Sequence, residues 1–172
     1  AQPLAADLAE LGAALGLDVQ PAIDTLAAAC QHWAAAAARD DADAWLVEYS
    51  RLFLTPPVAV TLNAGVYLEG AIGGASVQMV RSCYAAAGVE PDERFHDLPD
   101  HVAMQLEFVG RLHERAARGD ADAAAMTDEF CREFVDHWAE PLEGACRAAA
   151  ARLPAATVYA ALVRLLRDAT AA

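Results

Sequence analysis

The sequence contains no lysine, and its twelve basic residues are all arginines, scattered through a chain of 172 residues. No run of arginines forms an extended stripe, and the formal net charge is −13. A nucleic-acid binder needs clustered cations to displace the counterions of the phosphate backbone, so this composition argues against a nucleic-acid partner. An acidic surface favours solubility and would attract a cationic ligand or peptide instead.

Long apolar runs are also missing. Asp, Glu, Arg or Gly interrupts every apolar stretch before it reaches the roughly 20 residues that a membrane-spanning helix needs. The first residues lack the basic start and apolar core of a secretory signal. The four cysteines are widely spaced and form no Cys-x-x-Cys pair, which favours reduced thiols in a core. We therefore expect a cytoplasmic protein with no stable membrane insertion.

Motifs for catalysis and metal binding are absent as well. The chain has no His-Glu-x-x-His motif, no Gly-x-Ser-x-Gly motif and no matched Glu-x-x-His pairs on facing helices. Glu129, Glu133 and His137 share one helical face, but no second helix supplies matching ligands, so a solvated face is the expected explanation. The glycines of residues 70–74 follow no strand and precede no lysine, which argues against a phosphate loop. We expect no catalytic residue, metal or cofactor.

Apolar side chains recur at helical spacing along most of the chain, and much of the apolar fraction is alanine, the strongest helix former. Glycines and prolines mark most of the expected ends, because glycine adopts the left-handed conformation and proline cannot continue a helix. No strand-like alternation appears, so we predict an all-α fold. It would be a single domain over residues 1–172, a helical bundle of about seven or eight helices. The expected helices cover residues 4–15, 21–38, 45–54, 75–87, 98–118, 121–138, 142–153 and 155–169.

Two long irregular connections, residues 55–74 and 89–98, interrupt the predicted helices. Loops this long in a compact domain are more often functional than accidental, and the second is a plausible hinge for a domain-swapped dimer as the alternative to a monomer. It leads into a strong helix start, with Asp97 as the expected cap and Pro99 and Asp100 in the first turn. The expected apolar face of this helix contains Val102, Leu106, Val109 and Leu112, with Met104 and Phe108 beside it.

The pair Asp100-His101 admits two interpretations. It could form a catalytic base and its orienting carboxylate, or it could begin a helix, with Asp100 facing the first-turn amides and His101 bonded to a neighbouring loop. Spacing alone favours the helix start. No nucleophile or metal site accompanies the pair, so we do not expect an enzyme.

Three segments, in this order and at these intervals, resemble the TorD/DmsD/NarJ family of redox-enzyme maturation chaperones. The segments are Glu48-Tyr49-Ser50-Arg51-Leu52-Phe53 followed by Pro56-Pro57, then Val66-Tyr67, then Leu98-Pro99-Asp100-His101-Val102-Ala103-Met104-Gln105-Leu106-Glu107-Phe108. The resemblance covers residues 45–112. Gln105 stands where the family often has an acidic residue, and Ala64-Gly65 stands where a polar pair is usual.

The resemblance implies an all-helical chaperone that binds the N-terminal leader of a molybdenum-dependent oxidoreductase's catalytic subunit. In many members that leader is a twin-arginine export signal, and binding delays export or assembly until the cofactor is inserted. Such a leader calls for an apolar groove with an acidic rim. By the resemblance, the peptide-binding residues are Tyr49, Leu52, Phe53, Pro56, Tyr67, Glu69, Pro99, Asp100, His101, Met104 and Phe108.

Within this set, Tyr49 and Phe53 lie one helical turn apart, and a core or wall-supporting role is favoured for them over lining the groove. Tyr67, in a glycine-rich loop, is expected to be exposed. Asp97, Asp100 or Glu69 would receive guanidinium groups in charge-assisted bonds. An alternative from a different class is a helical small-molecule-binding protein, a carrier of a guanine nucleotide or of the molybdenum cofactor.

Overall fold

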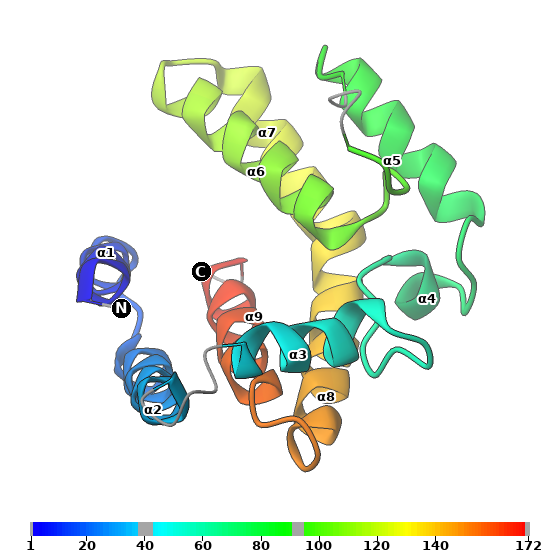
Figure 1. The fold of residues 1–172 in the computed structure, drawn as a ribbon. Helices are drawn as coiled ribbons and strands as arrows, with labels where there is room; N and C mark the ends of the chain where they lie inside the picture. Colours follow the sequence, from blue (N-terminus) through cyan, green and yellow to red (C-terminus); the bar gives the residue numbers. More distant parts are fainter. Residues whose placement is uncertain (1, 38–42, 91–94, 171–172) are drawn as a thin grey trace. The chain divides into compact units, whose positions relative to one another are not determined.

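The structure, a computed structural model, describes residues 2–37, 43–90 and 95–170 (Figure 1). In these ranges the chain forms helices and connections, without a β-strand and with an isolated bridge between Asn63 and His101. The prediction of an all-α fold is confirmed. Contacts within the chain group its residues into two compact units: the first unit is Ala1–Val60 with Ala139–Ala172, and the second unit is Thr61–Trp138.

The first unit contains the predicted N-terminal helices and the C-terminal helix. Gly16, with a φ of 67°, follows the first helix, and the third ends before Thr55-Pro56-Pro57, both as expected. The second helix packs along the last one, and the charged break at residues 39–41 lies outside the described residues. The elements are α1 (Gln2–Leu15), α2 (Gln20–Ala37), α3 (Ala44–Tyr49) with its π-helical continuation η1 (Ser50–Leu54), most of α8 (Asp136–Ala150), and α9 (Ala156–Thr170).

The second unit is built around two helices that lie side by side, α6 and α7 (Figure 1). Its elements are α4 (Gly65–Leu68), α5 (Ala75–Ala86), α6 (Val102–Ala117), α7 (Ala121–Phe130) and the π-helical segment η2 (Cys131–Val135). Aromatic rings fill its core: the ring centroid of Phe108 lies 4.7 Å from that of Tyr84 and 4.9 Å from that of Phe130. None of the helices in the described ranges is long and apolar enough to cross a membrane.

Arg115 and Asp120 join the ends of three helices in this unit. Asp120 is the N-cap of α7, where its Oδ1 accepts the Ala123 N–H at 3.1 Å. The Arg115 guanidinium donates to Asp120 Oδ2 at 2.8 and 3.0 Å, and to the Ala87 carbonyl, just after α5, at 2.7 Å. The irregular turn at Gly119, with a φ of 95°, is thereby held between α6 and α7.

Helix α6 begins later than the sequence suggested. Asp97 was expected to cap the helix with Pro99 and Asp100 in its first turn, but the N-cap is His101. The residues before it pair with another segment instead, because the Asp100 carbonyl accepts the Ala64 N–H at 3.0 Å and the Val102 N–H donates to the Leu62 carbonyl at 2.8 Å. The predicted apolar face is also wrong at one position: Leu106 is 37% exposed, and Gln105 is fully buried in its place.

Pro141 does not end a helix, contrary to the prediction. Helix α7, the π-helical η2 and α8 follow one another without interruption from Ala121 to Ala150, and Pro141 lies inside α8. Proline removes one backbone hydrogen bond, but a buried stripe continues past it at helical spacing and outweighs that loss. The stripe consists of Val135, Trp138, Ala139, Leu142, Cys146 and Ala149.

Candidate functional site

The predicted peptide-binding residues divide between the two units. Tyr49, Leu52, Phe53 and Pro56 belong to the first unit. The other seven belong to the second unit: Tyr67, Glu69, Pro99, Asp100, His101, Met104 and Phe108. Each set has its own local geometry, and the second unit's set is centred on Asp100.

Asp100 is fully buried and joins the turn before α6 to the turn at α4. Its Oδ2 accepts the Gly65 N–H at 2.9 Å, and its Oδ1 lies 3.5 Å from Asn63 Nδ2. Its backbone carbonyl accepts from Gln105 Nε2 at 2.8 Å, and Gln105 Oε1 in turn accepts from Trp138 Nε1 at 2.9 Å. A carboxylate with no exposed surface cannot receive a guanidinium from a peptide. Asp100 therefore acts here by holding two loops together.

Gly65 is required by this arrangement. A Cβ at this position would lie 2.7 Å from the Ala71 carbonyl oxygen and 2.9 Å from Asp100 Oδ2, distances that real Cβ atoms do not show. The absence of a side chain lets the Gly65 N–H reach the buried carboxylate. The sequence Ala64-Gly65, which departs from the family pattern, is thus explained by close backbone approach.

His101 is half-buried and serves as the N-cap of α6. Its Nδ1 accepts the Ala103 N–H at 3.1 Å, so the imidazole that caps the helix is neutral and carries its proton on Nε2. Burial lowers the pKa of His101 below its ordinary value, and the neighbouring carboxylates of Asp97 and Asp100 only partly oppose that effect. The ring also lies against Phe95, at a centroid distance of 5.5 Å.

Two carboxylates of the second unit remain exposed while bonded to backbone groups. Glu69 accepts the N–H groups of Ala75 and Ser76 at 2.9 and 3.0 Å and the Ser76 hydroxyl at 2.6 Å, and these bonds, the hydroxyl's first, lower its pKa. Asp97 accepts from Leu98 N at 2.7 Å and from Asn63 Nδ2 at 3.0 Å. Partial burial works to raise the pKa of Asp97, but these bonds keep it below the ordinary value. Both residues are exposed, and a carboxylate has about four acceptor sites, more than the bonds that either residue accepts here.

The remaining predicted residues of the second unit are buried or half-buried. Phe108 is 2% exposed, within the aromatic core, and the Pro99 carbonyl accepts the Tyr84 hydroxyl at 2.9 Å. Tyr67 lies on α4 and is half-buried rather than exposed, because its hydroxyl donates to the Thr61 carbonyl at 2.7 Å. Met104 is half-buried.

In the first unit, Leu52 is fully buried and Pro56 is exposed. Tyr49 and Phe53 are half-buried, with ring centroids 5.2 Å apart, and Phe53 meets Tyr159 of α9 edge-on at 4.8 Å. Sequence reasoning missed Tyr159, since no motif surrounds it and its only signal is its place on a helix with an apolar face. These rings pack α3 and η1 against α9.

The same helical run carries apolar side chains on its outside. Leu46 and Leu54 are each 61% exposed, Val47 is 46% exposed, and Val58, shortly after the run, is 40% exposed. Leu46, Val47 and Leu54 all belong to the uninterrupted run of α3 and η1, and all three side chains are exposed on it. We call Leu46, Val47 and Leu54 the α3 strip. No motif in the sequence indicates that these side chains are exposed.

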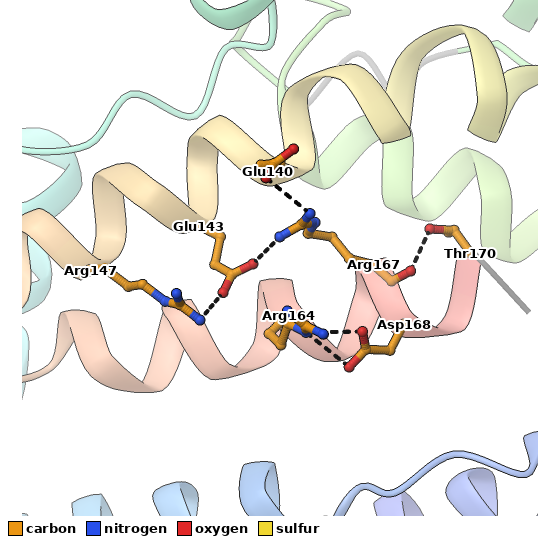
Figure 2. A network of polar contacts seen from close by, with 7 residues as sticks. All are labelled: Glu140, Glu143, Arg147, Arg164, Arg167, Asp168 and Thr170. Atoms are coloured by element: carbon orange, nitrogen blue, oxygen red, sulfur yellow. Dashed lines mark hydrogen bonds and ion pairs between the residues drawn. The ribbon is translucent and has the colours of Figure 1, made fainter.

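Helices α8 and α9 of the first unit are joined by a network of charged side chains (Figure 2). Glu143, only 2% exposed, forms ion pairs with Arg147 and with Arg167, the latter at 2.6 Å. Arg167 also lies 3.4 Å from the exposed Glu140, and Arg164 pairs with Asp168 at 2.9 Å. The network fastens α9 to α8.

The first unit contains a hollow of about 460 Å³. If the protein carried a guanine nucleotide or the molybdenum cofactor, this hollow would be a candidate binding site for it. The hollow is lined by parts of α2, α8 and α9, including Arg147 and Arg164. Both arginines are already paired, with Glu143 and Asp168, so the hollow offers little to a phosphate group. Among the described residues, no group of three or more His, Cys, Asp or Glu side chains is placed to hold a metal ion.

Comparison with known proteins identifies the family. The sequence matches the family described as nitrate reductase delta subunit over residues 4–143, most of the chain. No curated protein and no solved structure matches it. The matched region includes every segment on which the resemblance was based, and members of this family are chaperones rather than catalytic enzymes. The chain therefore belongs to the nitrate reductase delta subunit family, which comprises redox-enzyme maturation chaperones of the TorD/NarJ kind.

Proposed function

We propose that this protein is a cytoplasmic chaperone that binds the N-terminal leader of a molybdenum-dependent oxidoreductase's catalytic subunit, an enzyme of the nitrate reductase kind. Binding would delay export or assembly of that subunit until its cofactor is inserted. The chaperone itself would have no catalytic activity. The observation that best supports leader binding is the α3 strip, because its large apolar side chains are exposed beside the Tyr49-x-x-Leu52-Phe53 motif.

The energetics of such binding are favourable. Fully burying a leucine-sized side chain is worth about 1.5–3 kcal/mol, so covering the exposed parts of Leu46 and Leu54 would contribute about 1–2 kcal/mol each. The apolar stretch of the leader would gain a similar amount on its own side. Ordering the peptide opposes binding, which leaves an affinity in the micromolar range as the expectation.

The negative charge of the protein favours binding of the arginines of a leader. The net charge of −13 would attract a cationic peptide and speed its association. Within the second unit, the exposed carboxylates of Glu69 and Asp97 would accept guanidinium groups while continuing to bond the backbone. Asp100 would contribute only by positioning His101 and the α4 turn.

The test is a binding titration with a synthetic peptide that reproduces the N-terminal leader of a nitrate-reductase-type molybdenum subunit from the same organism. Leu54→Glu is expected to weaken binding at least tenfold by placing a carboxylate on the apolar contact. Ile72→Glu is the matched control, because Ile72 is 62% exposed and belongs to the second unit. Equal affinity of wild type and Leu54→Glu would refute the assignment of the α3 strip. Absence of binding to the wild-type protein would refute leader binding altogether.

A further inference from the structure

The second unit contains an apolar pocket that the proposed function does not use. It is a hollow of about 310 Å³ between α5, α6 and the run of α7 and η2. Phe108, Phe130 and Phe134 contribute to its walls, and each of them is at most 5% exposed. The rest of the lining comes from Ser82, Cys83, Ala86, Met126, Glu129 and Glu133.

The rim of this pocket is acidic on one side. Glu129 and Glu133 are exposed and four residues apart, so they stand one helical turn apart above the phenylalanines. Glu133 pairs with Arg132 at 3.7 Å, and Arg132 is 65% exposed, so this is a weak contact that an incoming cation can replace. Within the described part of the chain, the lining of the pocket contains no arginine.

The opposite wall is the end of α5, and it is apolar or weakly polar. Ser82, Cys83 and Ala86 lie on one face of this helix, and Met79, one turn before Cys83, is 55% exposed on the same face. The phenylalanine floor thus lies between the apolar wall of α5 and the acidic wall of Glu129 and Glu133. This arrangement is complementary to an amphipathic segment. The floor would bury one bulky apolar side chain, and the acidic wall would pair with cations beside it.

We infer that this pocket, which we call the Phe108 pocket, is a docking site for a short amphipathic helix from a partner protein. That helix would insert a leucine-like side chain and present two basic side chains one turn apart to Glu129 and Glu133. The inference does not depend on leader binding, because it concerns a cavity formed entirely by the second unit. Loss of one site would leave the other intact.

The probe is a synthetic fluorescent peptide of about 15 residues, alanine-based, with a central leucine pair and arginines one turn apart. Fluorescence anisotropy with the full chain should show saturable binding that weakens as salt rises. Peptides with glutamine in place of arginine, or alanine in place of leucine, should each bind at least fivefold more weakly. If the glutamine peptide binds as tightly as the arginine peptide, the acidic wall is not the recognition element and the inference is wrong.

Two pairs of variants locate the binding. Ala86→Leu fills the pocket and should weaken binding about tenfold or more, whereas Ala85→Leu, on an exposed neighbour that does not line the pocket, should leave it unchanged. Glu129→Gln should weaken binding about fivefold, and Asp128→Asn should not, although both remove one exposed charge. An unchanged affinity in Ala86→Leu, or an absence of peptide binding to the wild type, overturns the proposal.

Cys83 provides a second readout within the pocket. Its thiol is half-buried, and burial, followed by the nearby Glu129, raises its pKa, so it should react slowly with N-ethylmaleimide. Bound peptide should slow this alkylation further, in proportion to occupancy. Cleavage after Arg81 and Arg94 isolates Cys83 on a peptide without other cysteines, which allows mass spectrometry to follow it alone. Peptide that saturates in anisotropy without protecting Cys83 would place the binding elsewhere and refute the assignment.

Discussion

Replacing Asp100 with alanine tests whether this residue positions loops or contacts a ligand. The substitution removes the carboxylate that accepts the buried Gly65 N–H at 2.9 Å and leaves that donor without a partner. A hydrogen bond to a charged group is worth about 1.5–3 kcal/mol, and an unsatisfied buried donor adds to the loss. We therefore expect Asp100→Ala to lower the free energy of unfolding by about 3 kcal/mol. For a chain of this length, that corresponds to a fall in Tm of about 6–12 °C.

Two variants calibrate this value. Asp100→Asn retains a carbonyl oxygen for the Gly65 N–H and should cost only about 1 kcal/mol, because the new amide meets the Asn63 side chain, which can reorient. Asp97→Ala removes a carboxylate only three residues away, but an exposed one, and should cost less than about 1 kcal/mol. The order of stability should be Asp97→Ala, then Asp100→Asn, then Asp100→Ala.

The assay combines thermal unfolding, followed by circular dichroism, with leader-peptide titration at a temperature well below Tm. A positioning role predicts a large fall in Tm and a change in affinity of less than about tenfold, since the carboxylate itself has no exposed surface. The opposite pattern, an unchanged Tm with binding abolished, would refute the buried arrangement. It would restore Asp100 as a direct receptor for the peptide.

Three further predictions concern the other buried or close contacts. His101 caps α6 as a neutral imidazole, and burial lowers its pKa, so the protein should lose stability as pH falls below about 6.5. Urea unfolding at pH 7.5 and 5.5 measures this loss, and His101→Asn should make the free energy of unfolding less dependent on pH. Glu143→Gln should lower the free energy of unfolding, measured by chemical denaturation, by about 1–2 kcal/mol. Glu140→Gln should lower it by less than about 0.5 kcal/mol, because Glu140 is 74% exposed. Equal losses in the two variants would contradict a buried ion pair at Glu143. Gly65→Ala should lower the free energy of unfolding by about 2 kcal/mol or more. Gly144→Ala is the control and should raise Tm slightly, because the space around its Cβ position is open. A Gly65→Ala variant as stable as the wild type would show that the α4 turn can shift.

The helices were predictable because their signals are local. Gly16, Gly88 and Gly119 all have positive φ values and follow helices near the expected positions. Pro141 failed as a signal because a stripe of buried side chains, which includes Trp138 and Leu142, continues through it. A glycine or proline indicates where a helix tends to end, but the burial of side chains along the whole helical run decides whether it ends there.

The site was harder to predict because its contacts are between distant segments. The pairing of Asp100 with Gly65 spans 35 residues, and no periodicity within either loop indicates it. Tyr159 joins Phe53 across an even larger separation and belongs to no motif. The exposed positions of the α3 strip look like core positions in the sequence, because a leucine at helical spacing has the same pattern whether it faces inward or outward.

These differences change what the motif Leu98-Pro99-Asp100-His101 explains. The Pro99 carbonyl accepts from Tyr84, Asp100 bonds the α4 turn, and His101 caps α6, so each of these three residues makes a structural contact. A family motif whose members are occupied in this way would report on the shape of the binding surface rather than on direct contacts with the client. Client discrimination would then lie with exposed groups, such as the α3 strip. Substitutions there should alter which peptide is bound, whereas substitutions in the motif should alter whether the second unit holds its shape.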